Sequence, residues 1–237
     1  MKNSTKEIIN EINTYRDESK AAFLPRFFKT GKGEYGEGDQ FIGVVVPNLR
    51  IVAKKHFEAD FDTLRELLAS PYHEYRLTAL LALTYRYAKL KDHTSRETCV
   101  NFYVSQVDAI NNWDLVDLSC YKILGHWLFD KDKQLLYDWA KENHLWKQRI
   151  AMISCMHFVK QGEFKDALAI ADLLQHHPHD LIHKAVGWIL REIGKEDEQL
   201  LVDYLTPRYK EMPRTMLRYA IERFEEEKRK AFLNSTI

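Results

Sequence analysis

The sequence contains few of the residues that interrupt helices or form covalent cross-links. Its 237 residues include six prolines, nine glycines and three cysteines, and the cysteines (Cys99, Cys120 and Cys155) lie far apart. Zinc sites and disulfide frameworks use several cysteines at characteristic spacings. We therefore expect no metal site and no disulfide, and predict reduced, mostly buried thiols.

An excess of charge and a long apolar run are also absent. The chain has 35 basic and 35 acidic residues, so any surface for a polyanion must be local. No apolar run approaches the roughly 18 residues that a membrane span needs. The first residues are charged and helical in pattern rather than a signal sequence, so we predict a cytoplasmic protein without a membrane segment.

Apolar residues recur at helical spacing nearly everywhere, which predicts an all-α protein. The exception is residues 29–50, where four of the nine glycines fall within eight residues: Gly31, Gly33, Gly36 and Gly38. An apolar run at 42–46 follows. We predict a loop there, followed by a short extended segment.

Five similar units follow, each starting with polar or capping residues and continuing into a helix with a strong apolar face. The equivalent positions are Arg76, Asp117, Arg149, Lys184 and Arg218, at spacings of 41, 32, 35 and 34 residues. Such spacings are typical of two-helix repeats. We predict a single domain, 1–237, that is an α-solenoid of helical repeats with a concave, basic groove. Residues 1–50 form N-terminal helices and the glycine-rich loop, 51–230 stacked helical pairs, and 231–237 a tail.

The starts of the second helices would line that groove. They carry mainly basic and aromatic residues: Trp113, Asp117, Lys147, Arg149, Lys184, Trp188, Arg191, Arg214 and Arg218. Lys and Arg contact phosphates, and helix starts add positive dipole ends, so the pattern favours a polyanionic ligand. The alternative is structural, because helical repeats also use basic residues for hydrogen bonds between repeats and Trp for packing.

The segment 111–117, NNWDLVD, places an indole and two carboxylates at a helix start. An asparagine can cap this helix, and Asp114 in its first turn complements the helix dipole. Asp117 lies one turn after Trp113, on the same face of the helix and among apolar residues. A carboxylate there needs a polar or charged partner, or it has a functional role. A carboxylate beside an indole can stabilise a developing cation.

Two other patterns favour no ligand. The glycine-rich segment 31–39 lacks the lysine and hydroxyl pair of a phosphate-binding loop, and either a structural loop or a flexible lid fits it. A histidine-rich stretch contains His176, His177, His179 and His183. Without a cysteine or a regular carboxylate pattern, it predicts an exposed connection between helices rather than a metal site.

The chain resembles the AlkD-like DNA alkylation-repair glycosylases, which are built from HEAT-like helical repeats. The resemblance rests on residues 26–50, on NNWDLVD, on LWKQRIAMIS (145–154) and on KAVGWILREIGK (184–195). It implies hydrolysis of the N-glycosidic bond of alkylated purines, such as 3-methyladenine and 7-methylguanine, in duplex DNA. It also implies that the base stays in or near the stack, and that an abasic site remains.

The resemblance assigns roles to individual residues. It makes Asp117 the catalytic carboxylate and places Trp113 and Trp188 beside the lesion's backbone, with Arg149 and Arg191 on phosphates. Phe27 stands where relatives can carry tyrosine. His157 stands where a lysine can help to bind DNA, with Lys160 three residues later.

The implied enzyme is a monomer that uses no metal or cofactor. The DNA-binding set that we predict is Arg149, Arg191, Phe27, Lys184 and Lys160. The alternative is a non-catalytic helical-repeat protein that binds distorted DNA, or another macromolecule, through the same groove. The two hypotheses differ at Asp117.

Overall fold

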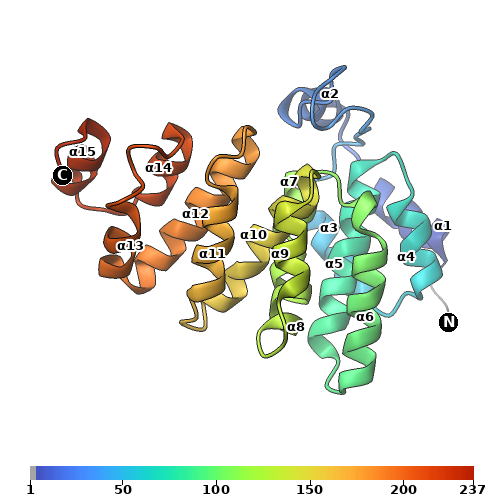
Figure 1. Cartoon of the computed structure of the whole chain (residues 1–237). Helices are drawn as coiled ribbons and strands as arrows, with labels where there is room; N and C mark the ends of the chain where they lie inside the picture. The colour runs from blue at the N-terminus through green and yellow to red at the C-terminus, as the bar shows by residue number, and fades with distance from the viewer. Residues whose placement is uncertain (1–3) are drawn as a thin grey trace. The chain divides into compact units, whose positions relative to one another are not determined.

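The computed structural model describes residues 4–237, and most of these are helical (Figure 1). Within that range no β-strand forms, and one isolated bridge joins Gln40 to Tyr72. The chain divides into two compact units, of which the first ends at Ile123 and the second is Leu124–Ile237. The all-α class and the helical repeats are therefore confirmed. The single domain and its concave, basic groove stay predictions.

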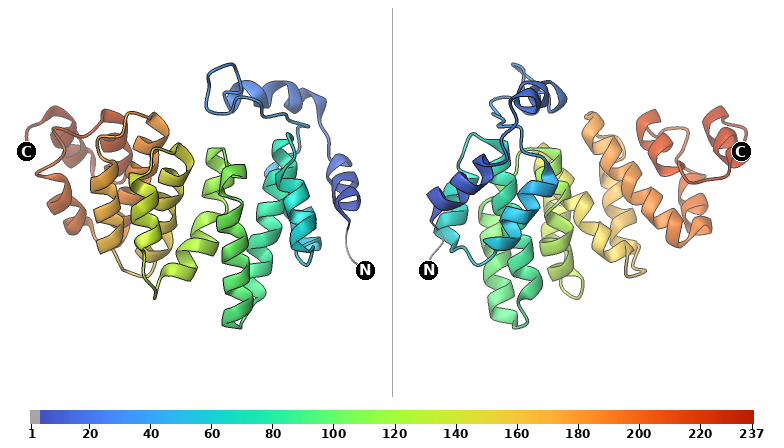
Figure 2. Two further views of the ribbon diagram at one scale, coloured as in Figure 1. Left: turned by 45° about the vertical axis from the view of Figure 1, so that its right-hand side comes forward. Right: turned by 180° about the vertical axis from the view of Figure 1, so that it is seen from behind.

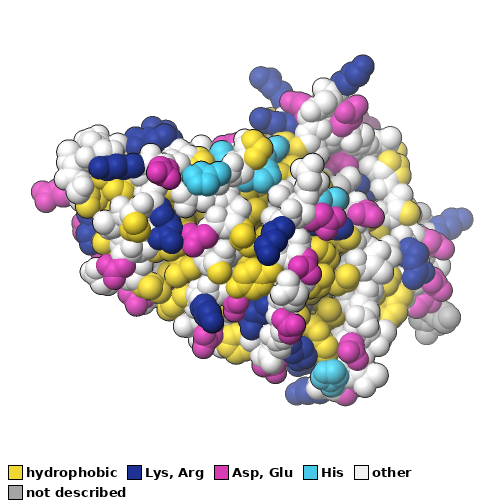
Figure 3. Space-filling view, in the orientation of Figure 1, with side chains coloured by type: hydrophobic (Ala, Val, Ile, Leu, Met, Phe, Trp, Pro, Cys, Tyr) yellow, Lys and Arg dark blue, Asp and Glu magenta, His cyan; other side chains and the backbone are white. Residues whose placement is uncertain are grey.

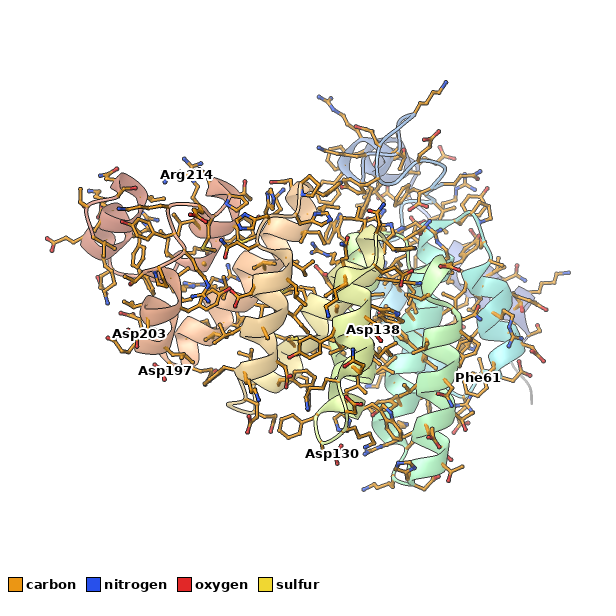
Figure 4. The ribbon with its side chains drawn as sticks, viewed as in Figure 1. Phe61, Asp130, Asp138, Asp197, Asp203 and Arg214 are labelled. Atoms are coloured by element: carbon orange, nitrogen blue, oxygen red, sulfur yellow. The ribbon has the colours of Figure 1, made fainter. Side chains whose placement is uncertain are left out.

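The first unit is built around one helix that is buried on nearly every side. Its helices are α1 (Thr5–Asn13), α2 (Glu18–Phe27), α3 (Val46–Lys55), α4 (Phe61–Leu68), α5 (His73–Lys89), α6 (His93–Ser105), the 3₁₀ turn η1 (Val107–Ala109) and α7 (Trp113–Asp117). α3, α4, α6 and α7 pack on α5, and α1 packs on α3 and α4. Most residues of α5 are buried, polar ones included, so the helix needs cover on most sides. Phe61 of α4 stacks on Phe102 of α6 at 4.7 Å (Figure 4).

α2 differs from the other helices of this unit because none of its residues is buried. It stands outside the bundle of α3, α4, α5 and α6 (Figure 1 and Figure 2). Asp17 caps it by accepting a hydrogen bond from the backbone N–H of Lys20 at 3.1 Å. The glycine-rich segment then returns to the bundle, where Gln40 bonds the backbone beside α5. The predicted loop is confirmed.

Glu74 of α5 holds the extended segment that precedes α3. One carboxylate oxygen accepts the backbone N–H groups of Ile42 at 3.0 Å, Gly43 at 2.8 Å and Val44 at 3.3 Å. Gly43 has a φ of +83°, and a Cβ there would lie 1.9 Å from the Asp17 carbonyl oxygen. Only glycine therefore fits at this crossing. Burial raises the pKa of Glu74, although the backbone donors oppose that shift.

The second unit repeats the helical pair three times. Its helices are α8 (His126–Leu128), α9 (Gln134–Lys141), α10 (Leu145–Val159), α11 (Lys165–Leu174), α12 (Asp180–Glu196), α13 (Glu198–Leu205), α14 (Arg214–Ala220) and α15 (Glu226–Asn234), and a π-helical turn η2 (Tyr121–Gly125) precedes them. α10 packs on α12, which packs on α14, and α9, α11 and α13 form the other row. Three of the predicted second helices are thus confirmed as α10, α12 and α14.

The end of the chain differs from the tail that we predicted. α15 continues to Asn234, and Phe232 within it is only 1% exposed. Its ring packs edge-on against Tyr209 at 5.3 Å and in a tilted arrangement against Phe224 at 5.7 Å. Arg214 at the start of α14 donates to the carbonyl of Leu233 at 2.9 Å (Figure 4). These contacts cover the last helical pair with a charged capping helix.

The contrast between two phenylalanines tests this docking. Phe232→Ala should lower the free energy of unfolding by about 3 kcal/mol, because it removes a fully buried ring and leaves a cavity. The matched control is Phe23→Ala, at a position 60% exposed, and it should change stability by less than about 0.5 kcal/mol. Urea unfolding followed by circular dichroism measures both, and equal effects would contradict the buried docking of α15.

Candidate active site

The helix with an apolar face that we predicted to begin near Trp113 is broken into short pieces. α7 ends at Asp117, and a turn separates it from η2 and α8. Ser119 donates its hydroxyl to the carbonyl of Leu115 at 2.6 Å, four residues earlier, and its oxygen lies 3.0 Å from the buried Tyr103 hydroxyl. Such back-bonding competes with the helix. Asp117 therefore stands at the C-terminal end of α7, where the helix dipole disfavours a carboxylate.

Trp113 begins α7 and rests on an aromatic stack. The buried Asn112 caps the helix, accepting from the Trp113 N–H at 2.8 Å, as predicted for this segment. The indole stacks on buried Phe28 at 5.4 Å and an interplanar angle of 19°, and Phe28 stacks on Phe41 at 5.0 Å and 16°. Phe27, 52% exposed, meets the indole edge-on at 6.1 Å. The half-buried indole is thus held on one face and flanked by an accessible ring.

A buried charge cluster lies under this stack. His73, the first residue of α5, places Nδ1 3.1 Å from Asp39 Oδ2 and Nε2 2.8 Å from Asp114 Oδ2. Asp39 also accepts from Arg76 and, at 3.1 Å, from the Asn112 amide. All five side chains are buried. Asp114 therefore does more than complement the helix dipole, the role that we predicted for it, because it ties α7 to α5.

The cluster keeps its charges at neutral pH. Burial alone would lower the pKa of His73, but the carboxylates of Asp114 and Asp39 outweigh it and raise this pKa to about 9. Burial would raise the pKa of Asp39, but His73 and Arg76 outweigh it and lower that pKa. Two cations thus face two carboxylates, and a buried pair of this kind is retained only when hydrogen bonds satisfy it.

Asp117 is half-buried, one helical turn from Trp113. Asp117 interacts electrostatically with Tyr103. The pKa of Tyr103 is raised well above its usual value, first by burial and then by electrostatic interactions with Cys120 and Asp117. Tyr103 therefore stays a neutral phenol near neutral pH. This part of the site offers a carboxylate that can attract a cation or orient a water molecule, and an indole face beside it.

The predicted residues of the second unit are partly engaged in structural contacts. Arg149 of α10 is 4% exposed and donates to the carbonyl of Leu181, at the start of α12. This is the hydrogen bond between repeats that our alternative reading expected. Lys184 pairs with Asp180 at 2.7 Å, and Arg191 pairs with Glu222. Their contacts with phosphates stay predictions.

The remaining predicted residues of this unit lie on the same helices. Trp188 of α12 is half-buried and follows Gly187, whose position leaves no room for a Cβ beside the Met216 carbonyl of α14. His157 lies against His126, with ring centroids 5.0 Å apart, and Lys160 is exposed just after α10. Burial, His126 and Lys160 lower the pKa of His157.

Basic side chains do not gather on the face that Figure 3 shows. There, Lys and Arg are scattered among Asp and Glu. The histidine-rich connection is only partly exposed, because His177, His179 and His183 are half-buried. His179 caps α12 by accepting a hydrogen bond from the Leu181 N–H at 3.1 Å. In residues 4–237 no cluster of His, Cys, Asp or Glu side chains has the composition of a metal site. Cys99, Cys120 and Cys155 are all buried, as the sequence predicted.

Sequence reasoning missed four members of the site: Phe28, Asp39, Phe41 and His73. They come from separate segments and form no contiguous motif. The available signals were weak. An aspartate ends the glycine-rich loop and a histidine begins the apolar helix at 73, and both could be explained by capping.

Comparisons with known proteins identify the family. The sequence profile of the family described as "DNA alkylation repair enzyme" matches residues 8–224. The chain belongs to this family. No curated protein matched the sequence. A solved structure described as "Predicted DNA alkylation repair enzyme from Enterococcus faecalis" has the same fold, with a TM-score of 0.68 and 14% identity, covering 89% of this chain and 97% of that chain.

In this DNA alkylation repair family member, the indole and the second carboxylate of the NNWDLVD segment lie on one short helix. The family makes DNA its substrate and repair of alkylation its role. None of the helices in the part of the chain described by the structure is both long and apolar enough to span a membrane.

The raised pKa of His73 predicts a specific pH dependence. A folded-state pKa of about 9 against an ordinary 6.5 means that the stabilisation is complete below pH 6.5 and is lost as pH rises to about 9. Between these values the free energy of unfolding should fall by about 3 kcal/mol more in the wild type than in His73→Gln. Urea unfolding at a series of pH values measures this, and parallel curves for the two proteins would contradict it.

Proposed function

We propose that the protein is a monofunctional DNA glycosylase. It hydrolyses the N-glycosidic bond of alkylated, cationic purines such as 3-methyladenine and 7-methylguanine in duplex DNA, and leaves an abasic site. The observation that carries the proposal is the position of Trp113 and Asp117 at the two ends of α7, where the indole rests on Phe28 and the carboxylate stands one turn away. Membership of the DNA alkylation repair family supplies the substrate class.

The chemistry needs only one carboxylate. An alkylated purine of this kind already carries a positive charge, so the bonding electrons can leave with the base without prior protonation. Positive charge then develops on the sugar, as in other glycoside hydrolyses. Asp117 stabilises this charge and accepts a proton from the attacking water, whose oxygen forms the new bond to the anomeric carbon. The negative face of the Trp113 ring also stabilises the positive charge on the sugar.

The protein holds the DNA by its backbone and does not extrude the base. Arg149, Arg191, Lys184 and Lys160 contact phosphates, Phe27 stacks near the lesion, and Trp188 contacts the deoxyribose beside it. Most glycosylases flip their target into a deep pocket. Leaving the base in the stack instead restricts the enzyme to labile, cationic lesions. The loss of a tyrosine hydroxyl at Phe27 and the presence of His157 weaken individual contacts without removing Asp117.

The enzyme does not cut the strand. Water rather than an amine attacks the sugar, so no Schiff base forms and no β-elimination follows. The mechanism requires no metal or cofactor. We expect a monomer in the cytoplasm whose partner is damaged duplex DNA.

The second candidate is a helical-repeat protein that binds distorted DNA without excision. The contacts of the predicted phosphate ligands do not separate the two candidates, because the Arg149 guanidinium bonds a backbone carbonyl and that of Arg191 a carboxylate, whichever candidate holds. The two candidates share the fold and the family, and they differ in whether Asp117 is needed.

Substitution of Asp117 separates them. Asp117→Asn should reduce release of free 7-methylguanine from methylated duplex DNA by at least about 100-fold, because the amide carries no charge to stabilise the sugar cation. Its affinity for the same duplex should stay within about threefold of wild type. The matched control is Asp62→Asn, at an exposed aspartate of α4, and it should excise normally. Full activity in Asp117→Asn would refute the assigned role.

Substitution of Arg149 and of Arg191 should affect DNA binding alike but the free energy of unfolding differently. Arg149→Ala and Arg191→Ala should each weaken duplex binding and make its salt dependence shallower by about one charge. Arg149→Ala should also lower the free energy of unfolding by about 2 kcal/mol, since it leaves the buried Leu181 carbonyl without this donor. Binding titrations at several salt concentrations, with urea unfolding of the same proteins, measure both. Unchanged binding in both variants would remove them from the DNA interface.

A further inference from the structure

The surroundings of the His73 ring determine its protonation state by geometry. Each ring nitrogen lies within hydrogen-bond distance of a carboxylate oxygen, at 3.1 Å from Asp39 and 2.8 Å from Asp114. A carboxylate only accepts, and a neutral imidazole can donate from only one nitrogen. Both contacts are therefore hydrogen bonds only when the ring is an imidazolium that donates from both sides.

Three contacts of this ring lead to the start of α7. Asp114 follows Trp113 directly, and Asp39 also accepts from the amide of Asn112, the residue that caps α7. The third route is aromatic, because Phe28 lies 4.8 Å from the His73 ring and 5.4 Å from the Trp113 ring. One buried side chain of α5 thus reaches the cap, the first turn and the indole of the helix that carries Asp117.

α7 cannot hold this arrangement by itself. It is five residues long, well below the length at which a helix is stable alone, so external contacts must fix its direction. Asp114 depends on His73 in particular, because its other carboxylate oxygen is buried without a hydrogen-bond partner. Removing the ring's second donor would leave that carboxylate buried and unsatisfied.

We infer that His73 is a positioning residue of the excision site: its doubly donating ring fixes the first turn of α7, and through it the Trp113 indole and the Asp117 carboxylate. The inference rests on the proposed function. His73 touches neither DNA nor water in the reaction; it acts through Asp114, Asp39 and Phe28. Such indirect support commonly changes activity 10- to 100-fold, because small displacements of reacting groups are costly.

The arrangement makes the site sensitive to alkaline pH. The charged groups that face His73 are Asp39 from the loop, Asp114 from α7, and Arg76 and Glu74 from α5 itself. When the ring loses a proton, one ring nitrogen presents a lone pair to a carboxylate. One of the two hydrogen bonds, to Asp39 or to Asp114, is then lost. The raised pKa of His73, about 9, puts this change above neutral pH.

The coupling can be measured on the wild-type protein itself, and a variant is needed only to assign one signal. Between pH 6 and pH 10, nuclear magnetic resonance can follow the His73 ring and the indole N–H of Trp113, assigned by comparison with Trp113→Phe. The Trp113 signal should move with the same midpoint as His73, while the signals of the buried Trp139 and Trp146 in the second unit should not. A Trp113 signal that ignores the His73 titration would overturn the inference.

Excision kinetics test its consequence. His73→Gln should lower the single-turnover rate of 7-methylguanine release about 10- to 100-fold while duplex affinity changes less than about threefold. The matched control is His56→Gln, because His56 is also buried in the first unit and pairs with Glu11 at 2.7 Å, but lies at the end of α3. That variant should excise within about twofold of wild type.

Failure of this inference differs from failure of the proposed function. A wild-type protein that releases no base refutes the glycosylase, and the resonance titration still decides whether His73 controls α7. If the wild type is active, a His73→Gln protein that excises at the wild-type rate, or a His56→Gln protein that is equally impaired, overturns the positioning role. An equal loss of excision rate in both variants would reflect lower stability of the first unit rather than a changed position of α7.

Discussion

The candidate site depends on the hydrogen bonds between His73 and two buried carboxylates. They join three parts of the first unit that are distant in sequence: the end of the glycine-rich loop, the start of α5 and the first turn of α7. Burying four charges is costly, and the cost is offset only while each finds its partner. A short helix with an indole at one end and a carboxylate at the other is thereby held in one orientation.

This arrangement suits a reaction in which the protein supplies position and charge rather than a strong acid. A cationic purine needs little help to leave, so the enzyme needs a carboxylate at the sugar and a firm hold on the DNA backbone. In the proposed function, a rigid aromatic support under Trp113 and a single carboxylate at the end of α7 meet the first need. We propose that basic residues of the second unit, several of which also stabilise helix contacts, meet the second.

Much of the fold could be predicted from the sequence because helical periodicity is a local property. The all-α class, the glycine-rich loop and the helices at 145–159 and 180–196 followed from apolar spacing and capping residues. Two features could not be predicted this way. The break after Asp117 depends on Ser119 meeting both Leu115 and the distant Tyr103, and the helical end of the chain depends on a pocket that Tyr209 and Phe224 form around Phe232. The His73 cluster joins residues 39, 73 and 114, a contact that only tertiary structure creates.

The measurement that most directly tests the central claim compares two guanine lesions that differ in charge. Duplexes of one sequence would carry either 7-methylguanine, which is cationic, or O6-methylguanine, which is neutral, and single-turnover release of each free base would be followed. A site that stabilises only the sugar cation should release the cationic base at least about 100-fold faster, without strand cleavage. Equal release of the two bases would contradict the account. Release of neither base by folded protein that still binds the duplex would mean that the protein recognises DNA without excising a base.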